Sequence, residues 1–314
     1  GYYFDSKFTP ERRLDGRVSV VTGANSGVGL ATSVALVGLG SQVILACRNE
    51  EKAKAAIQHI LTHHPSSSHL VTYLPLDTSS LSSVISFTSA LPPKLDILIN
   101  NAGVVKVPEE EEGDGVCPVF KTNFLGHFLL TNLVIGKLKE SARSGFSARV
   151  VNVSSGRHAD ATISWEGTRL SADAYGQSKL AQIMAGKHLQ KMINEEPSAL
   201  WEERVQVISI TPGFVMTNIL SNFRQDFSWF KTIIFYLMIP IMHYFSRTPT
   251  AGAQVMIMAA VGDNVEGGKY YSNCYEKPTI GQNDMTNNEK ECQKLWEMSE
   301  RLVEEEKKRE GVKE

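Results

Sequence analysis

Tyr175 and Lys179 are the first residues whose types and spacing indicate chemistry. They lie four positions apart in residues 172–189, a run that predicts a helix. Residues i and i+4 of a helix face the same side, one turn apart. A free tyrosine phenol titrates near pH ~10, so it exchanges protons at neutral pH only if its pKa is lowered. An ammonium one turn away favours the phenolate and lowers that pKa.

A single ammonium cannot complete this shift. Bringing the phenol pKa down to ~7 requires ~3 units, on the order of 4 kcal/mol. An exposed ion pair contributes about 1 kcal/mol or less. We therefore expect a second positive charge beside Tyr175. Tyr–Lys pairs at this spacing also occur on solvated helix faces, so the rest of the chain has to supply a hydride carrier and a group that binds a carbonyl.

The composition is that of an ordinary globular protein. The chain has 314 residues, of which 42% are hydrophobic and 21% charged. Its net charge of -2 gives no electrostatic reason to expect nucleic acid as a partner. The cysteines lie far apart without metal-ligand spacing, so we expect reduced thiols in an intracellular protein and no metal site. The acidic run at residues 109–112 predicts a solvated loop.

Short apolar runs alternate along the chain with stretches of helical periodicity. The expected strands cover residues 17–21, 42–47, 69–76, 95–99, 148–153, 205–210 and 268–271. The expected helices cover residues 30–39, 50–61, 81–91, 119–138, 172–189 and 289–308. This alternation predicts one α/β domain with a doubly wound, mostly parallel, seven-stranded sheet and helices on both faces.

A glycine-rich turn, Thr-Gly-Ala-Asn-Ser-Gly-Val-Gly at residues 22–29, joins the first strand to its helix. Glycines allow a tight turn and let the backbone approach a pyrophosphate at the helix N-terminus. The spacing is G-x-x-x-G-x-G instead of the usual G-x-G-x-x-G. A tight connection alone would also suit these glycines, but the place after the first strand favours a Rossmann-type dinucleotide site. The expected cofactor contacts are Gly23, Asn25, Ser26, Gly27, Val28 and Gly29.

Arg48 decides between the two nicotinamide cofactors. A dinucleotide site usually has an acidic residue about 20 positions on, which binds the ribose 2′-hydroxyl. The second strand ends here in Ala46-Cys47-Arg48, without a carboxylate. A guanidinium suits a 2′-phosphate, so we expect NADP(H) in preference to NAD(H), unless Arg48 is only a surface side chain. Asp77, after the third strand, is expected either to bind the adenine amino group or to cap the helix that starts near Ser79.

With the Tyr–Lys pair and this glycine pattern, the chain resembles the short-chain dehydrogenase/reductase family. Residues 100–103, Asn-Asn-Ala-Gly, are similar to a family motif that flanks the adenosine side of the cofactor, and residues 212–217 resemble the segment that holds the nicotinamide amide. The resemblance implies further cofactor contacts at Asn101, Ala102, Gly103, Tyr175, Lys179, Pro212, Gly213, Val215 and Thr217.

The same resemblance implies a catalytic set of four residues, Asn123, Ser155, Tyr175 and Lys179. Tyr175 would exchange a proton with the carbonyl oxygen, and Ser155 would hydrogen-bond that oxygen. Lys179 would lower the tyrosine pKa and bind the nicotinamide ribose, and Asn123 would hold a water that links Lys179 to solvent. The oxidised nicotinamide would provide the second positive charge.

Each of these residues also has a purely structural interpretation. Ser155 could cap the loop after its strand, Asn123 could be a polar residue inside a helix, and Lys179 could be a solvated surface lysine.

Within the family, the chain resembles retinol dehydrogenase-like members. The similarity lies in residues 46–49, 123–128, 178–181, 252–254 and 268–271. Such members are mostly NADP(H)-dependent and often membrane-associated. The chain departs from them at Thr211, where many relatives carry a histidine, and in the lack of a visible N-terminal anchor.

The domain division follows from these assignments. We expect an N-terminal extension at residues 1–14, a Rossmann-type oxidoreductase domain at 15–285 and a charged C-terminal helix at 286–314. The apolar segment at 214–247 is expected to be a substrate lid or a pair of core-packing helices. Its part at 229–245 could also lie in a membrane interface. We expect an intracellular protein, either cytosolic or peripheral on the cytosolic face of the endoplasmic reticulum, and the family resemblance is compatible with a homodimer.

The leading hypothesis is an NADP(H)-dependent oxidoreductase of lipophilic alcohols and carbonyls, retinoid- or steroid-like. One alternative is a reductase of small xenobiotic carbonyls. The other is a cofactor-binding regulatory or scaffold protein that keeps the fold without turnover.

Overall fold

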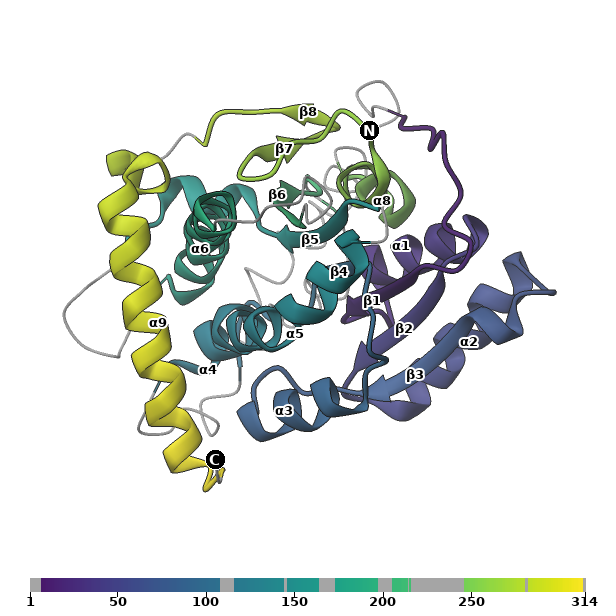
Figure 1. The fold of residues 1–314 in the computed structure, drawn as a ribbon, viewed down its shortest axis with the longest axis horizontal. Coiled ribbons are helices and arrows are strands. Elements are labelled where there is room, and N and C mark those ends of the chain that lie inside the picture. Colours follow the sequence, from purple (N-terminus) through teal and green to yellow (C-terminus); the bar gives the residue numbers. More distant parts are fainter. Residues whose placement is uncertain are drawn as a thin grey trace, which may run out of the picture.

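One twisted sheet forms the centre of the molecule (Figure 1). The structure is a computed structural model that describes residues 7–107, 116–143, 146–163, 173–196, 205–213, 215, 246–279 and 282–312. Within these residues the sheet has eight strands in the order β3-β2-β1-β4-β5-β6-β7-β8. They are β1 Val18–Thr22, β2 Gln42–Cys47, β3 Val71–Pro75, β4 Ile97–Asn100, β5 Ala148–Val153, β6 Val205–Thr211, β7 Tyr270–Ser272 and β8 Tyr275–Glu276. Strands β1 to β7 pair in parallel.

Helices cover both faces of this sheet. They are α1 Gly27–Gly38, α2 Glu50–His63, α3 Leu81–Ala90, α4 Pro118–Phe120, α5 Gly126–Arg143, α6 Ala174–Glu195, α8 Pro249–Val261 and α9 Glu289–Arg309. A π-helical turn, Lys121–Leu125, joins α4 to α5. The short 3₁₀ helices are η1 Ser68–Leu70, η4 Gly156–Asp160 and η6 Gln282–Asn287.

Two hydrophobic clusters, one on each face, form the core. Successive side chains of a strand point to opposite faces, and β1 follows this rule. Val20 packs with α3, α5, α6 and α9, whereas Val21 packs with α1, α2 and α8. Leu98 and Ile99 of β4 divide in the same way. The predicted doubly wound, mostly parallel sheet with helices on both faces is therefore confirmed.

The predicted strand count of seven was wrong, because a short antiparallel strand follows β7. Tyr271 pairs with Glu276 and Ser272 with Tyr275. The turn between them places Asn273 and Cys274 at φ values of 53° and 63°. Two positive φ values at the centre of a two-residue turn are typical of type I′ hairpins, which favour Asn-Gly. Cysteine in the second position gave no sequence signal for this hairpin.

The long apolar helix predicted at 119–138 is instead three consecutive segments that end at Arg143. The π turn in its middle has no sequence signature, since a local sequence does not specify where an extra residue is inserted in a helix. Helix α1 begins at Gly27, within the glycine-rich turn, so the nucleotide motif forms the first turn of that helix. Helix α8 was not among the expected helices.

Gly126 marks a close contact between the start of α5 and the loop before α3. An ideal Cβ on Gly126 would overlap the carbonyl oxygen of Thr78. Because the obstacle is backbone, neither side can move away without shifting an element. The glycine therefore holds α5 against the loop that carries Asp77.

Replacing Gly126 with Ala is expected to destabilise the protein by about 1–3 kcal/mol, as overpacking in a close backbone contact does. Gly136→Ala is the matched control, because Gly136 lies on the same helix with open space around it. Alanine should there be neutral or stabilising, by up to about 1 kcal/mol. Chemical denaturation of the two variants measures the difference, and equal midpoints would contradict the contact.

Candidate active site

The turns that leave six parallel strands lie along one edge of the sheet. Carboxyl ends of parallel strands share an edge, and ligands of such sheets bind in the crevice where the strand order reverses. Here the strand order reverses between β1 and β4, which are neighbours in the sheet. Each turn carries one of the predicted site residues: Gly23 after β1, Arg48 after β2, Asp77 after β3, Asn101 after β4, Ser155 after β5 and Pro212 after β6.

The glycine-rich turn packs directly on the segment that follows β4. Gly23 and Gly27 have φ values of 64° and 56°, a region that favours glycine. An ideal Cβ on Gly23 would lie 2.9 Å from the Cα of Ala102. One on Gly29 would lie 2.5 Å from Nδ2 of Asn101. These glycines therefore leave no room for side chains between the turn and its neighbour.

The N-terminus of α1 is open to a charged ligand. Ser26 precedes the helix in extended conformation, and its side chain makes no capping hydrogen bond. Its neighbours Asn25 and Val28 lie in the same turn. The first amides of a helix lack intrahelical partners and attract anions. This end of α1 therefore meets the requirements of a pyrophosphate site.

Arg48 and Asp77 approach one another at the outer end of the edge. Arg48 Nη1 lies 3.8 Å from Asp77 Oδ2, and the Arg48 side chain is 75% exposed. Asp77 Oδ1 also accepts hydrogen bonds from the backbone and hydroxyl groups of Ser79. Ser80, not Asp77, is the N-cap of α3. Asp77 thus orders the loop before α3, and its contact with adenine stays a prediction.

Asn123 lies in the π turn and clamps the segment after β4. Its Oδ1 accepts from the Val104 amide at 2.7 Å, and its Nδ2 donates to the Val104 carbonyl at 2.8 Å. Nδ2 also donates to Oγ of Ser178, next to Lys179. π turns are frequent at functional sites because they redirect one side chain or carbonyl. The side chain that sequence reasoning chose is therefore held between two site segments.

A buried histidine ties Asn123 to the nucleotide turn. Nδ1 of His127 donates to the Asn123 carbonyl at 2.8 Å, and Nε2 lies 2.9 Å from Oγ1 of Thr22. Burial lowers the pKa of His127 to about 4, so the ring is neutral. The carbonyl can only accept, so the proton is on Nδ1 and the Thr22 hydroxyl donates to Nε2. Thr22 Oγ1 in turn accepts from the amides of Asn101 and Ala102.

Tyr175 lies in the first turn of α6. Asp173 caps α6 by accepting from the Gly176 amide. Burial raises the pKa of the Tyr175 phenol, whereas a side-chain hydrogen bond with Ser155 and the charge of Arg157 lower it. The Ser155 hydroxyl is therefore close enough to the Tyr175 phenol to influence its pKa, as expected of two groups that share one carbonyl oxygen. Arg157 forms an ion pair with Asp173 at 2.9 Å.

Lys179 is a buried cation without a carboxylate contact in the described residues. Its Nζ donates to the Val153 carbonyl at 2.7 Å and lies 3.4 Å from Oε1 of Gln182. Burial lowers the pKa of Lys179 to about 7. Nζ also lies 5.8 Å from the centre of the Tyr175 ring. The interpretation of Lys179 as a solvated surface lysine is excluded, because the residue is only 4% exposed.

Gly103 provides the space in which Lys179 and Asn123 meet. An ideal Cβ on Gly103 would lie 3.3 Å from Asn123 Oδ1 and 3.5 Å from Lys179 Nζ. Both atoms therefore face the same small volume, one from the π turn and one from α6. A side chain at position 103 would compete with them for it.

The segment after β6 lies against the start of α1. An ideal Cβ on Gly252 would lie 2.6 Å from Val215, 3.4 Å from Val28 and 3.6 Å from Pro212. Arg247 pairs with Val215 as an isolated bridge and donates to the Pro212 carbonyl. Gly213 has a φ value of 81°. The predicted residue Thr217 lies outside the described residues.

The arrangement fits a nicotinamide dinucleotide. The glycines let the turn pack closely on the segment after β4, no side chain caps the first amides of α1, and an ammonium is buried without a carboxylate contact in the described residues. A pyrophosphate would satisfy the amides, and ribose hydroxyls are acceptors that Lys179 could bind. Charge, space and donors therefore all suit this cofactor class.

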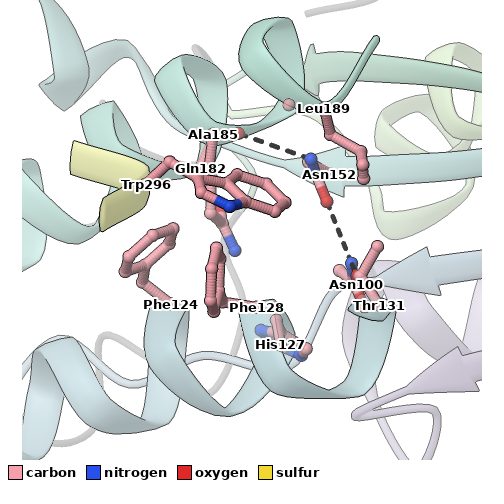
Figure 2. Close-up of a pocket in the computed structure, with 11 residues that line it drawn as sticks. Asn100, Phe124, His127, Phe128, Thr131, Asn152, Gln182, Ala185, Leu189 and Trp296 are labelled. Atoms are coloured by element: carbon pink, nitrogen blue, oxygen red, sulfur yellow. Dashed lines mark hydrogen bonds between the residues drawn. The ribbon is translucent and has the colours of Figure 1, made fainter. Parts of the chain in front are cut away.

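A small cavity lies beside Phe124 of the π turn, and none of the four predicted catalytic residues lines it (Figure 2). Its volume is about 30 Å³, and α5, α6 and α9 line it with the sheet. Asn100 Nδ2 donates to Asn152 Oδ1 at 2.9 Å, and Asn152 Nδ2 donates to the Gln182 carbonyl. Asn100 Oδ1 has no hydrogen-bond partner in the described residues. Such a space suits one water molecule and is too small for a substrate.

Sequence reasoning missed four residues that hold the site together. His127 and Gln182 support Asn123 and Lys179, and both donate to the Asn123 carbonyl. Their helical spacing, four after Asn123 and three after Lys179, was an available signal. Arg157 beside Tyr175 and Arg247 at Pro212 act across long distances in the sequence, and no local pattern indicated them.

The sequence of this chain is similar to those of known dehydrogenases. Residues 17–227 match the family model described as short chain dehydrogenase. Polyprenol dehydrogenase of Homo sapiens is 36% identical over 309 residues, covering 95% of this chain and 88% of that protein. Retinol dehydrogenase 12 of Mus musculus is 34% identical over 303 residues, covering 94% and 89%.

Solved structures share the fold. A crystal structure of an uncharacterised protein from Mycobacterium paratuberculosis has a TM-score of 0.70 and 28% identity, covering 95% of this chain and 98% of that one. The RhlG/NADP active-site complex of Pseudomonas aeruginosa has a TM-score of 0.64 and 24% identity, covering 84% and 97%.

The buried His127 predicts a specific loss of stability in acid. Its folded pKa of about 4 lies below the unfolded value, so stability is complete above pH ~6.5 and falls as the pH drops toward 4. The slope from this one group is at most about 1.4 kcal/mol per pH unit. A His127→Gln variant should lack this component when the unfolding free energies of both proteins are measured between pH 7 and ~4. Identical pH slopes would contradict a neutral, buried imidazole.

Proposed function

The chain belongs to the short-chain dehydrogenase family, and from that membership we propose an NADP(H)-dependent oxidoreductase of lipophilic alcohols and carbonyls. Membership of this family means that the protein is an oxidoreductase that acts on CH–OH donors with NAD(P)+ as acceptor. The choice of NADP(H), the roles of single residues and the substrate class are our inference. The observation that carries it is the meeting of Ser155 and Tyr175, with Lys179 buried one turn away.

Tyr175 is the group that exchanges a proton with the substrate oxygen. When bound, the nicotinamide ring supplies or accepts the hydride. The Tyr175 phenol donates to the carbonyl oxygen during reduction and takes the proton back during oxidation. Ser155, whose hydroxyl lowers the pKa of the phenol, donates to the same oxygen and stabilises its developing negative charge.

The surroundings of Tyr175 support the expected need for a second charge. Burial raises the pKa of the phenol, and Arg157 is a nearby cation that lowers it. Lys179, with a pKa of about 7, holds a proton that it can exchange at neutral pH. The positive charge of an oxidised cofactor would lower the phenol pKa further, because opposite charges nearby favour the phenolate.

Asn123 positions the segment of Gly103 and Val104 in this proposal. Its side chain uses both Nδ2 hydrogens within the protein, on the Val104 carbonyl and on Ser178. Its backbone carbonyl accepts hydrogen bonds from the side chains of His127 and Gln182. These contacts support a role in shaping the pocket around Lys179. The predicted water between Asn123 and Lys179 stays a prediction.

Arg48 supports the choice of NADP(H). It follows β2, where a carboxylate would bind a ribose 2′-hydroxyl, and its side chain is largely exposed. Asp77 lies close enough to orient the guanidinium without covering it. A planar guanidinium binds a phosphate through two hydrogen bonds.

The relatives support a lipophilic substrate. Their names specify polyprenol and retinol, both long apolar alcohols. The predicted lid at 214–247 lies mostly outside the described residues, so its role stays a prediction. The same holds for a membrane contact through 229–245, for the cytosolic or endoplasmic reticulum location and for a homodimer. None of the described helices is both long and apolar enough to cross a bilayer.

A reductase of small xenobiotic carbonyls and a non-catalytic cofactor-binding protein remain the alternatives. The intact set of Asn123, Ser155, Tyr175 and Lys179 argues against the second. A protein without turnover has no need to bury an ammonium beside a phenol that contacts a serine.

The substrate panel with a Tyr175→Phe variant tests the proposal. Wild-type protein should oxidise NADPH with retinal-like or other long-chain carbonyls faster than with short aldehydes. The variant should lose at least about 100-fold in kcat, as removal of a general acid does. Cofactor titration of the variant by fluorescence serves as the control for folding. Near-normal turnover in the variant would exclude Tyr175 as the proton donor, and a faster reaction with short aldehydes would favour the xenobiotic alternative.

Replacing Arg48 with Ala tests the cofactor preference. Losing the guanidinium should weaken NADP(H) about 10- to 100-fold, equivalent to one charge-assisted bidentate contact, and leave NAD(H) within a factor of about two. Arg157→Ala is the charge-matched control, because Arg157 lies at the Tyr175 end of the site. Equal losses for both cofactors in the Arg48 variant would refute the 2′-phosphate assignment.

A further inference from the structure

Three segments that are distant in the sequence meet at the C-terminal end of α9. Glu310 is the residue that ends this helix. Lys121 is the first residue of the π turn that carries Asn123. The third segment is the start of α3, which follows the loop of Asp77. Figure 1 shows the yellow helix α9 running past α6 and α4 toward α3.

The Glu310 carboxylate binds both other segments at once. Its Oε1 accepts from Lys121 Nζ at 2.8 Å and from the Leu81 amide at 3.0 Å. Its Oε2 accepts from the Ser82 amide at 2.9 Å and from the Ser80 hydroxyl at 3.2 Å. Four donors therefore converge on one carboxylate. Two of them are first-turn amides of α3 that have no intrahelical partner.

Lys121 joins the same cluster to the body of α9. Its Nζ donates to Glu306 Oε2 at 2.8 Å, in addition to Glu310. The Lys121 side chain is 15% exposed and the Glu306 side chain 8%. Arg309 donates to the other oxygen of Glu306. Ion pairs so far removed from water are screened much less than surface pairs.

The cluster holds Glu310 ionised. Burial alone would raise the pKa of its carboxyl, but the hydrogen bonds from Lys121, Ser82 and Leu81 outweigh it and lower the pKa to about 2. The carboxylate is therefore charged at neutral pH. Its contacts are a permanent part of the fold.

The positions of these contacts matter for the site. Lys121 precedes Asn123 by two residues in the same turn. Gly126, at the end of that turn, packs on the Thr78 carbonyl. Glu310 thus binds the π turn at its start, while the loop of Asp77 supports it at its end. Movement of either segment would carry Asn123 with it.

Helix α9 does not need Glu310 to remain docked. Leu295, Trp296, Leu302 and Val303 are buried in the core, and the Trp296 ring packs edge-on against Phe128 at 4.7 Å. Each such side chain contributes about 1.5–3 kcal/mol by burial. Removing one carboxylate at the end of the helix therefore leaves the helix in place.

We propose that Glu310 and Lys121 are positioning residues, through which the end of α9 sets the π turn and with it Asn123. The inference rests on the proposed function, since it assigns Asn123 to the reaction site. It adds that the C-terminal end of the chain, which carries none of the predicted catalytic residues, controls turnover.

The test compares Glu310→Gln with Glu305→Gln in the full chain. Glutamine keeps the shape of Glu310 but turns one acceptor into a donor, so at least one of the four donors loses its partner. Glu305 is the matched control, because it lies on the same helix and pairs only loosely with Arg301, at 3.8 Å. Turnover with NADPH, thermal stability and hydrogen exchange of residues 119–128 are measured for both variants and for wild type.

We expect Glu310→Gln to lower kcat about tenfold, as a sub-ångström displacement of a site group can, with KM for the carbonyl changed less than about twofold. Amides of residues 119–128 should exchange faster than in Glu305→Gln, at nearly equal melting temperatures. Lys121→Met should also lower turnover, and the double variant should lose less than the sum of the two single losses, because both changes remove the shared Lys121–Glu310 contact. Lys121→Arg, which keeps the charge, should restore most of the turnover.

Glu310→Gln with the kcat of Glu305→Gln would overturn the proposal. So would a fall in kcat without faster exchange at residues 119–128, because the effect would then not pass through the π turn. If wild type turns over no carbonyl, the proposed function fails by itself. The exchange comparison then decides whether Glu310 holds the turn.

Discussion

Lys179 imposes the main constraint on this structure, because it is a cation buried beside a tyrosine without a carboxylate contact in the described residues. Lowering its pKa from 10.5 to about 7 corresponds to roughly 5 kcal/mol of unfavourable desolvation. The protein offers Nζ a strand carbonyl, Val153, and an amide oxygen, Gln182. Gly103 leaves room in front of it. A ligand with oxygen acceptors would relieve this cost, so the site is built to gain from binding one.

The parallel sheet explains why the sequence was informative about the chemistry. Continuous apolar strands and a Tyr–Lys pair at helical spacing are local patterns, and each predicted strand from β1 to β7 is present. The sheet then brings the turns after these strands to one edge without any further information. Contacts between side chains that are far apart in the sequence could not be predicted in this way. His127 reaches Thr22 over 105 positions, and Lys121 reaches Glu310 over 189. Such partners depend on tertiary packing, which no spacing encodes.

Local rules also failed where the backbone is unusual. The π turn at Lys121–Leu125 is supported by a local and a long-range contact: the backbone carbonyl of Asn123 accepts from His127, four residues on, and from Gln182 of α6. Nothing in that stretch distinguishes it from an ordinary helix. The β7–β8 hairpin likewise uses Cys274 at a positive φ, where glycine is the usual signal. Both exceptions lie where tertiary contacts outweigh local preference.

The C-terminal third of the chain contributes none of the four predicted catalytic side chains but restrains the elements that carry them. Tyr270 of β7 donates to Thr211 and packs edge-on against His158, whose Nδ1 donates to the Ser155 carbonyl at 2.6 Å. Thr211 therefore has a defined partner here. Arg247 restrains Pro212, and Glu310 restrains the turn of Asn123. Since a proton transfer requires groups within hydrogen-bond reach, these distant restraints would keep the groups of the proposed reaction in place. Substitutions at Arg247, Tyr270 or Glu310 should therefore change turnover, although none of these residues belongs to the four predicted catalytic side chains.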